Sequence, residues 1–168
     1  MLTGGVTVKK YYSVVLVAVL ALTISAISIV WAADGYSEKA MAKIKELQEI
    51  EKNKGDMPAS LEGIPVVNGD EVKAMKAKGV TILDNRVKPQ YDTEKIEGAK
   101  WFFCDDLLKN PAMSDTLDKE KDYVVYCNGI RCWRSPAVAI MLQDRGFKKI
   151  HWYREGIPDW KKRGYPTE

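Results

Sequence analysis

The sequence predicts an α/β fold with a central, mainly parallel sheet flanked by helices. The first observation is a series of short apolar runs of strand length, at residues 64–67, 80–83, 99–103, 122–126 and 150–153. The second is that helix-forming segments lie between several of these runs. Strands that alternate with helices are joined by crossovers, so they pair in parallel.

Residues 1–33 predict export. Lys9 and Lys10 precede an uncharged apolar run over 11–33, and the small residues around Trp31 offer a cleavage site just before Asp34. This order is typical of a secretory signal peptide. An uncleaved membrane anchor is the alternative, because about 20 apolar residues can span a bilayer. In both cases the positive flank stays inside, so we expect the rest of the chain to be periplasmic or anchored facing outward from the cytoplasm.

Residues 34–60 form a charged extension that we expect to be helical over 37–54. Apolar residues recur there at helical spacing and form a narrow stripe: Ala40, Met41, Ile44, Leu47 and Ile50. One interpretation is a solvated helix whose stripe packs on the domain. The other is a spacer or a helix through which two copies dimerise, although fewer than three heptads are a weak coiled-coil signal.

Residues 61–168 are predicted to form one domain. The segment from Ser135 to Gly146 predicts a buried helix, with Ser135 as N-cap, Pro136 at the first helical position and Gly146 left-handed after it. The preceding strand ends at Tyr126. The loop 127–134 must therefore join the carboxyl end of a parallel strand to a helix N-terminus, which is the usual ligand crevice of open α/β sheets.

The loop 127–134 contains the residues that we expect to carry chemistry. Cys127 is the candidate nucleophile, and an inert core cysteine is the alternative. Six residues are candidates for an anion-binding loop: Asn128, Gly129, Ile130, Arg131, Trp133 and Arg134. The helix N-terminus, the loop N–H groups and the two arginines should stabilise a thiolate, the reactive form of cysteine. Such a cradle suits sulfur transfer from an oxyanion or attack on a phosphate ester.

Several segments resemble those of rhodanese-like domains. The matching residues are 124–127, Arg134, Ser135, Leu142 and 146–147 in the active-site strand, loop and helix, and Trp152, Tyr153, 156–157, Trp160 and 164–166 in the closing segment. Upstream, Asp84-Asn-Arg86 resembles the family's Asp-x-Arg motif, and Tyr91, Ile96 and 98–99 resemble its HIPGA region. The resemblance covers about residues 62–166.

The resemblance implies a rhodanese-like three-layer fold in which Cys127 carries sulfur as a persulfide. It also implies that Asp84 and Arg86 lie beside the loop, hold it and tune its charge; a surface salt bridge is the alternative. Arg134 would point inward, and Ser135 would support the loop.

The loop departs from the family's Cys-x-x-Gly-x-Arg-Ser pattern. Six residues, not four, separate Cys127 from Arg134, and Cys132 lies among them. Our hypothesis is that Cys132 attacks the Cys127 persulfide, releases sulfide and leaves a disulfide. An oxidising compartment would equally allow a resting disulfide. The alternative is that Cys132 packs beside Trp133. Lys95 replaces the family's histidine, which persulfide transfer does not require.

Other features restrict the function classes. The net charge of +3 includes Lys9 and Lys10, and no basic stretch is present, so nucleic-acid binding is not expected. His151 is the single histidine, and we expect no metal site. Cys104 is interpreted as a small core residue, with a third redox partner as the alternative.

The sequence thus predicts an exported sulfurtransferase that moves sulfane sulfur from thiosulfate or a persulfide, through Cys127, to a thiol or protein acceptor. The covalent persulfide replaces any bound cofactor. The alternatives are a cysteine-dependent phosphatase or arsenate reductase, and a non-catalytic binding module of the cell envelope. Contact with a membrane is expected only through an uncleaved N-terminal segment.

Overall fold

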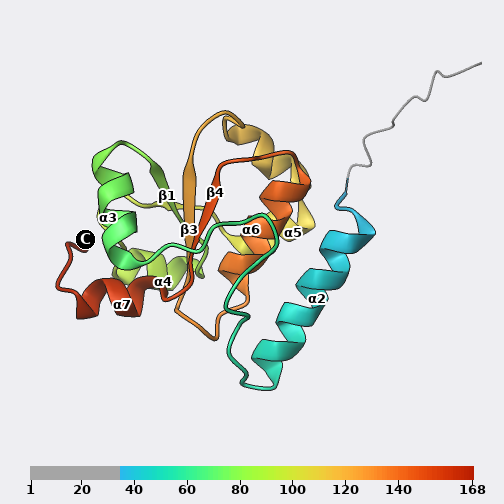
Figure 1. Ribbon diagram of the computed structural model, residues 1–168, viewed down its shortest axis with the longest axis horizontal. Coiled ribbons are helices and arrows are strands. Elements are labelled where there is room, and N and C mark those ends of the chain that lie inside the picture. The colour runs from blue at the N-terminus through green and yellow to red at the C-terminus, as the bar shows by residue number, and fades with distance from the viewer. Residues whose placement is uncertain (1–34) are drawn as a thin grey trace, which may run out of the picture. The chain divides into compact units, whose positions relative to one another are not determined.

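The computed structural model describes residues 35–168 (Figure 1). The predicted signal peptide or anchor lies outside these residues, so its identity stays a prediction. Within 35–168, no helix combines the length and the apolar character needed to cross a membrane.

A four-stranded parallel sheet forms the centre of the fold, which confirms the predicted class. The strands are β1 (Thr81–Asp84), β2 (Lys100–Trp101), β3 (Tyr123–Tyr126) and β4 (Ile150–Tyr153), in the spatial order β2-β1-β3-β4. All three pairings are parallel, and β3 lies between β1 and β4 along its full length. The carboxyl ends of β1, β3 and β4 therefore meet at one edge.

Two of the predicted strands are shorter than expected. The run 64–67 contributes only an isolated parallel bridge between Val66 and Trp152. Pro65 interrupts it because proline has no N–H to donate, although its carbonyl accepts the Trp152 N–H. In the run 99–103, only 100–101 form β2, because Phe102 already leads into a helix that begins at Cys104.

Helices cover both faces of the sheet (Figure 1). The helices are α2 (Glu38–Lys52), α3 (Gly69–Ala77), α4 (Lys88–Thr93), α5 (Cys104–Lys109), α6 (Arg134–Asp144) and α7 (Gly156–Lys162), with a 3-10 helix over Pro111–Thr116. Side chains alternate along β3, so Val125 joins the hydrophobic cluster under α2, α5 and α6, while Val124 and Tyr126 join the cluster under α3 and α7. This is a three-layer arrangement.

The predicted helix over 37–54 is present as α2. Ser37 caps it by accepting the Ala40 N–H, and its hydroxyl donates to Asp144 at the end of α6. Ala40, Ile44 and Leu47 are buried in the same cluster as α6. The stripe therefore packs on the domain, as the first interpretation expects. Dimerisation through this helix stays a prediction.

The start of α6 differs from the prediction. The N-cap is Trp133, without a side-chain cap, and the helix begins at Arg134. Ser135 lies inside the first turn, where its hydroxyl accepts the indole N–H of Trp152 at 3.0 Å. This contact fixes the first turn of α6 to β4. Gly146 follows the helix with φ +90°, the left-handed conformation expected there.

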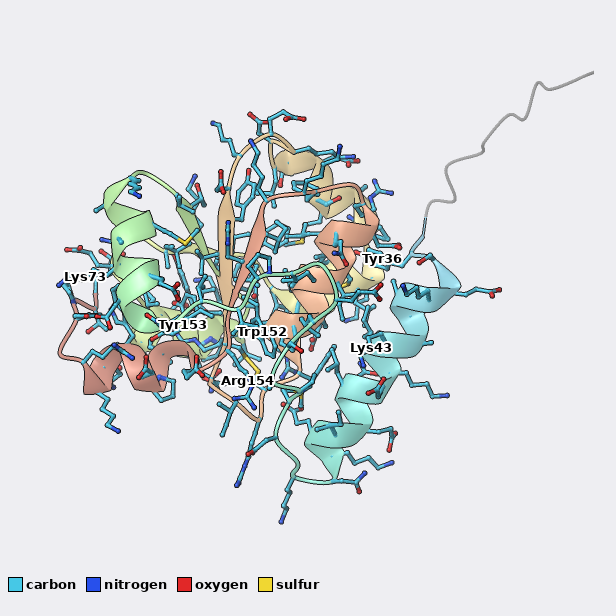
Figure 2. All side chains as sticks on the ribbon, viewed as in Figure 1. Tyr36, Lys43, Lys73, Trp152, Tyr153 and Arg154 are labelled. Atoms are coloured by element: carbon cyan, nitrogen blue, oxygen red, sulfur yellow. A yellow bond between two sulfur atoms is a disulfide. The ribbon has the colours of Figure 1, made fainter. Side chains whose placement is uncertain are left out.

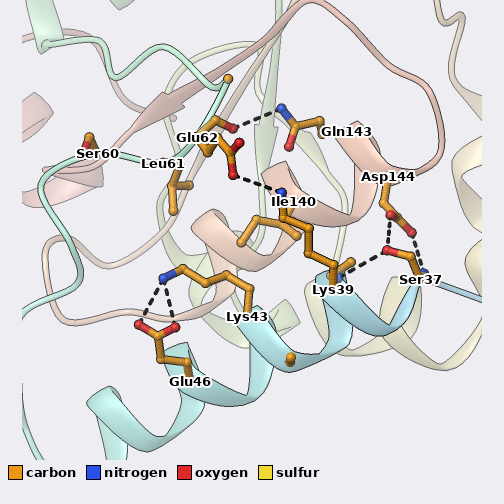
Figure 3. A pocket seen from close by; sticks show the side chains of 13 residues that line it. Ser37, Lys39, Lys43, Glu46, Ser60, Leu61, Glu62, Ile140, Gln143 and Asp144 are labelled. Carbon is orange, nitrogen blue, oxygen red and sulfur yellow. Dashed lines mark hydrogen bonds and ion pairs between the residues drawn. The ribbon is translucent and has the colours of Figure 1, made fainter.

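A pocket lies between α2, residues 60–63 and α6 (Figure 3). Ion pairs join Lys39 to Glu62 and Lys43 to Glu46 at its edge. No residue of the loop 127–134 lines this pocket. It is therefore not part of the candidate site.

Candidate active site

Cys127 directly follows β3 at the carboxyl edge of the sheet. Its carbonyl accepts the N–H of Ile157, 3.1 Å away, at the start of α7. Gly156 adopts φ +61°, and a Cβ there would lie 2.3 Å from the Cys127 oxygen. Only glycine lets the backbone approach this closely. The loop is thus seated on the segment that follows β4.

The rest of the loop folds back on Cys127. The Cys132 N–H donates to the Gly129 carbonyl at 3.0 Å, and Gly129 takes φ +103°, which closes a turn. Cys127 and Cys132 are joined by a disulfide, with 6.3 Å between their Cα atoms. The two residues are 1% and 6% exposed. In this oxidised form neither sulfur is a thiolate, so nucleophilic chemistry at Cys127 requires reduction.

Both loop arginines pair with carboxylates from other segments. Arg131 Nε lies 3.2 Å from Asp56. Arg134 forms two contacts of 3.1 Å with Asp105 on α5, and its guanidinium lies near the Phe103 and Trp133 rings. Arg134 is therefore paired with Asp105 on the neighbouring helix, and its expected inward direction stays a prediction. The positive charge predicted for the cradle is largely compensated.

Residues 51–58, which we call the covering segment, lie against the loop. The Met57 N–H donates to the Ile130 carbonyl at 2.7 Å, and Glu51 Oε1 accepts the Trp133 N–H at 3.4 Å. Arg154, which follows Trp152 and Tyr153 of β4 (Figure 2), donates to the carbonyls of Met57 and Pro58. These contacts make the predicted extension part of the site.

Sequence reasoning did not identify Glu51, Asp56, Met57 or Arg154 as site residues. Nothing in the residues around them signals such a role, because charged residues at a helix end are ordinary surface residues. Gly156 carried a signal, since it belongs to the closing segment that resembles the family.

Of the remaining loop residues, Asn128 donates through its amide to Gln90, and Ile130 is 37% exposed.

Asp84 and Arg86 form a buried ion pair at the end of β1. Arg86 Nη2 lies 2.6 Å from Asp84 Oδ2 and also donates to the Glu94 carbonyl at 2.7 Å. Burial opposes the charge on Arg86, yet the hydrogen bonds and charge of Asp84 raise its pKa. The pair is therefore not a surface salt bridge.

Tyr126 links this ion pair to the nucleophile. Its hydroxyl donates to Asp84 and accepts the Ile96 N–H at 3.2 Å. Burial and the nearby Asp84 carboxylate raise the pKa of Tyr126, so it stays a neutral donor. Asp84 and Arg86 thus hold the residue that precedes Cys127, and neither side chain forms a hydrogen bond to the loop 127–134.

Cys104 and His151 are the remaining candidate residues. Cys104 is a free, buried cysteine in the core, and burial raises the pKa of its thiol well above the ordinary value. His151 Nε2 lies 3.1 Å from Asp122, the residue that precedes β3, and so points toward the opposite end of the strand from Cys127. In residues 35–168 no group of three or more His, Cys, Asp or Glu side chains could hold a metal ion.

Comparison with known proteins agrees with this geometry. Residues 68–163 match the model of the rhodanese-like domain. The chain belongs to the rhodanese-like family. At this level the family and the fold support an enzyme of the sulfurtransferase or cysteine-phosphatase type. No curated protein matches the sequence.

Solved rhodanese-like structures resemble this one. The rhodanese-like domain of an Anabaena sp. protein is 33% identical, with a TM-score of 0.53 over 62% of this chain and 78% of its own. A rhodanese-related protein from Thermoplasma volcanium is 25% identical, with a TM-score of 0.53 over 62% of this chain and 97% of its own. A Rhodopseudomonas palustris protein of unknown function, described as a possible tyrosine phosphatase, is 23% identical, with a TM-score of 0.55 over 74% of this chain and 93% of its own. This last likeness shows the fold alone.

Proposed function

We propose that this rhodanese-like protein is an exported sulfurtransferase in which Cys127 carries sulfane sulfur as a persulfide. The observation that carries the proposal is the position of Cys127. It lies at the end of a buried parallel strand, in a loop that leads to the N-terminus of a helix. A reduced Cys127 thiolate would attack the sulfane sulfur of thiosulfate or of an organic persulfide. Sulfite or a thiolate leaves, and one sulfur atom remains on Cys127.

We further propose that Cys132 removes this sulfur. The disulfide supports this role because it requires the two sulfur atoms to reach one another. The Cys132 thiolate would attack the Cys127 Sγ of the persulfide, forming the disulfide and releasing hydrosulfide. The sulfane sulfur is reduced to sulfide while the two cysteines are oxidised. External thiols must then return two electrons before the next cycle.

Sulfur loading combined with thiol counting tests both roles. The reduced chain is mixed with each donor and examined by intact-protein mass spectrometry. The wild type is expected to release sulfide and gain a disulfide, whereas Cys132→Ser should retain one extra sulfur atom. Cys127→Ser should do neither. Sulfur that loads on Cys127→Ser would refute Cys127 as the carrier, and sulfide release from Cys132→Ser at the wild-type rate would refute the resolving role.

A phosphatase is the second candidate, because the loop is longer than the rhodanese pattern between Cys127 and Arg134. The pairing of both loop arginines with carboxylates argues against binding of a phosphate dianion. An aryl-phosphate assay of the reduced chain separates the two functions. Hydrolysis that depends on Cys127, without sulfur loading, would favour the phosphatase.

A periplasmic or membrane-anchored location would suit a disulfide in the active loop. The proposed partners are a small sulfur-containing donor and a thiol or protein acceptor, with no cofactor besides the persulfide. A non-catalytic binding role would instead leave partner capture intact in Cys127→Ser.

A further inference from the structure

Carboxylates oppose both arginines of the loop and the backbone N–H at the N-cap of α6. Arg131 pairs with Asp56 at 3.2 Å, and Arg134 pairs with Asp105 at 3.1 Å. The N–H of Trp133, at the N-cap of α6, donates to the Glu51 carboxylate at 3.4 Å. A small dianion that approached the loop would therefore compete with three carboxylates.

Two of these carboxylates are held in place by the covering segment 51–58. Its Met57 is buried and donates its N–H to the loop carbonyl of Ile130 at 2.7 Å. Arg154 donates to the carbonyls of Met57 and Pro58 at 2.7 and 3.0 Å. Backbone contacts therefore fix the segment, so its charges stay beside the loop even when a ligand competes for the arginines.

The charge balance disfavours a dianion. The two loop guanidiniums meet three carboxylates, which leaves a net charge of −1 among these groups. Arg154 adds one positive charge, but its bonded donors are directed to neutral carbonyls. Exposed apolar surface is also present, because Ile130 is 37% exposed in the loop itself. Such surface favours contact with the carbon atoms of an organic donor over contact with the charged oxygens of thiosulfate.

We propose that Glu51, Asp56 and Asp105 make this site select the organic persulfide of a thiol over the thiosulfate dianion. The inference rests on the proposed transfer of sulfur to Cys127. In this reaction the Cys127 thiolate attacks the terminal sulfur of R–S–SH. The S–S bond of the donor breaks, RS⁻ leaves, and Cys127–S–SH forms. No external electrons are needed for this step once the loop is reduced.

Loading kinetics in a Cys132→Ser background test the selection, because the persulfide then accumulates. The two donors are thiosulfate and the persulfide of 2-mercaptoethanol, whose organic group is uncharged. The Cys132→Ser chain, which is the parent of the variants below, should gain sulfur faster from the organic persulfide than from thiosulfate. Three variants each remove one negative charge: Glu51→Gln, Asp56→Asn and Asp105→Asn. Each should raise the second-order rate constant for loading from thiosulfate about tenfold at low salt and leave the rate constant for the organic persulfide nearly unchanged. The reason is that removal of one negative charge relieves the repulsion of a dianion most.

Glu46→Gln is the matched control, because Glu46 lies on the same helix but pairs with Lys43 at the pocket edge. This substitution should change the rate constant for loading from neither donor. Raised salt should speed thiosulfate loading in the parent more than in Asp56→Asn, because ions screen the repulsion.

A parent that prefers thiosulfate would overturn the inference, as would variants that change both donors equally. If the organic persulfide loads Cys127 but the three carboxylate variants do not speed loading from thiosulfate, the inferred donor selection is overturned and the proposed sulfurtransferase function still stands. Failure of both donors to load Cys127 would instead refute the proposed function, and the inference with it.

Discussion

Replacing Gly156 by alanine probes the contact that seats the active loop. The new Cβ would lie 2.3 Å from the Cys127 oxygen, 2.8 Å from the Gly129 nitrogen and 3.0 Å from the Cys127 carbonyl carbon. These are backbone atoms and cannot rotate away. The positive φ of +61° adds strain of about 1–2 kcal/mol for a residue with a Cβ. Overlap in a packed region adds about 1–3 kcal/mol.

The expected loss in free energy of unfolding is therefore about 3 kcal/mol for Gly156→Ala. Gly164→Ala is the matched control, because Gly164 has a similar φ of +70° but nothing within 4 Å of its Cβ position. It should lose only about 1–2 kcal/mol, from strain alone.

Urea denaturation of the oxidised chain measures both values. Gly156→Ala should also slow sulfur loading of the reduced chain, because the collision displaces the backbone of Cys127 itself. Equal losses in the two variants would refute the argument that close approach to Cys127 requires glycine. So would a destabilised Gly156→Ala whose loading rate matched that of the wild type.

Three further predictions concern the core beneath the site. Tyr126→Phe leaves the buried Ile96 N–H unpaired and removes one of the hydrogen bonds that Asp84 Oδ2 accepts, while its bonds from Arg86 remain, so urea denaturation should show a loss of about 1–3 kcal/mol; an unchanged midpoint would contradict this. Asp84→Asn leaves the Arg86 charge buried without its partner and should cost about 3–5 kcal/mol by the same measurement. A cost no larger than that of a surface pair would show that Arg86 finds other compensation. Because burial raises the pKa of Cys104, the folded chain keeps this proton when the unfolded chain loses it. The free energy of unfolding should therefore fall as pH rises above about 8.5, and Cys104→Ala should remove that fall.

The main elements were predictable from local patterns. Periodic apolar residues and cap signals located α2, β1, β3, β4 and α6 to within a few residues. One failure came where a distant group changed the local outcome, and another came from a residue inside the segment itself. Ser135 has the chemistry of an N-cap, but its hydroxyl accepts from the indole of Trp152, a residue of the neighbouring strand. Pro65 limits its segment to a single bridge beside β4 because it has no N–H to donate.

The sequence by itself determined where Cys127 lies, because a buried strand followed by a loop and a helix places that residue at the carboxyl edge of a parallel sheet. It also placed Cys132 in the same loop. Only the tertiary structure decided which charges surround the two cysteines. Arg131 pairs with a residue 75 positions away, Arg134 with one 29 away, and the Trp133 N–H with one 82 away. Such pairs depend on which segments pack together in space, and the composition of the loop does not specify its partners.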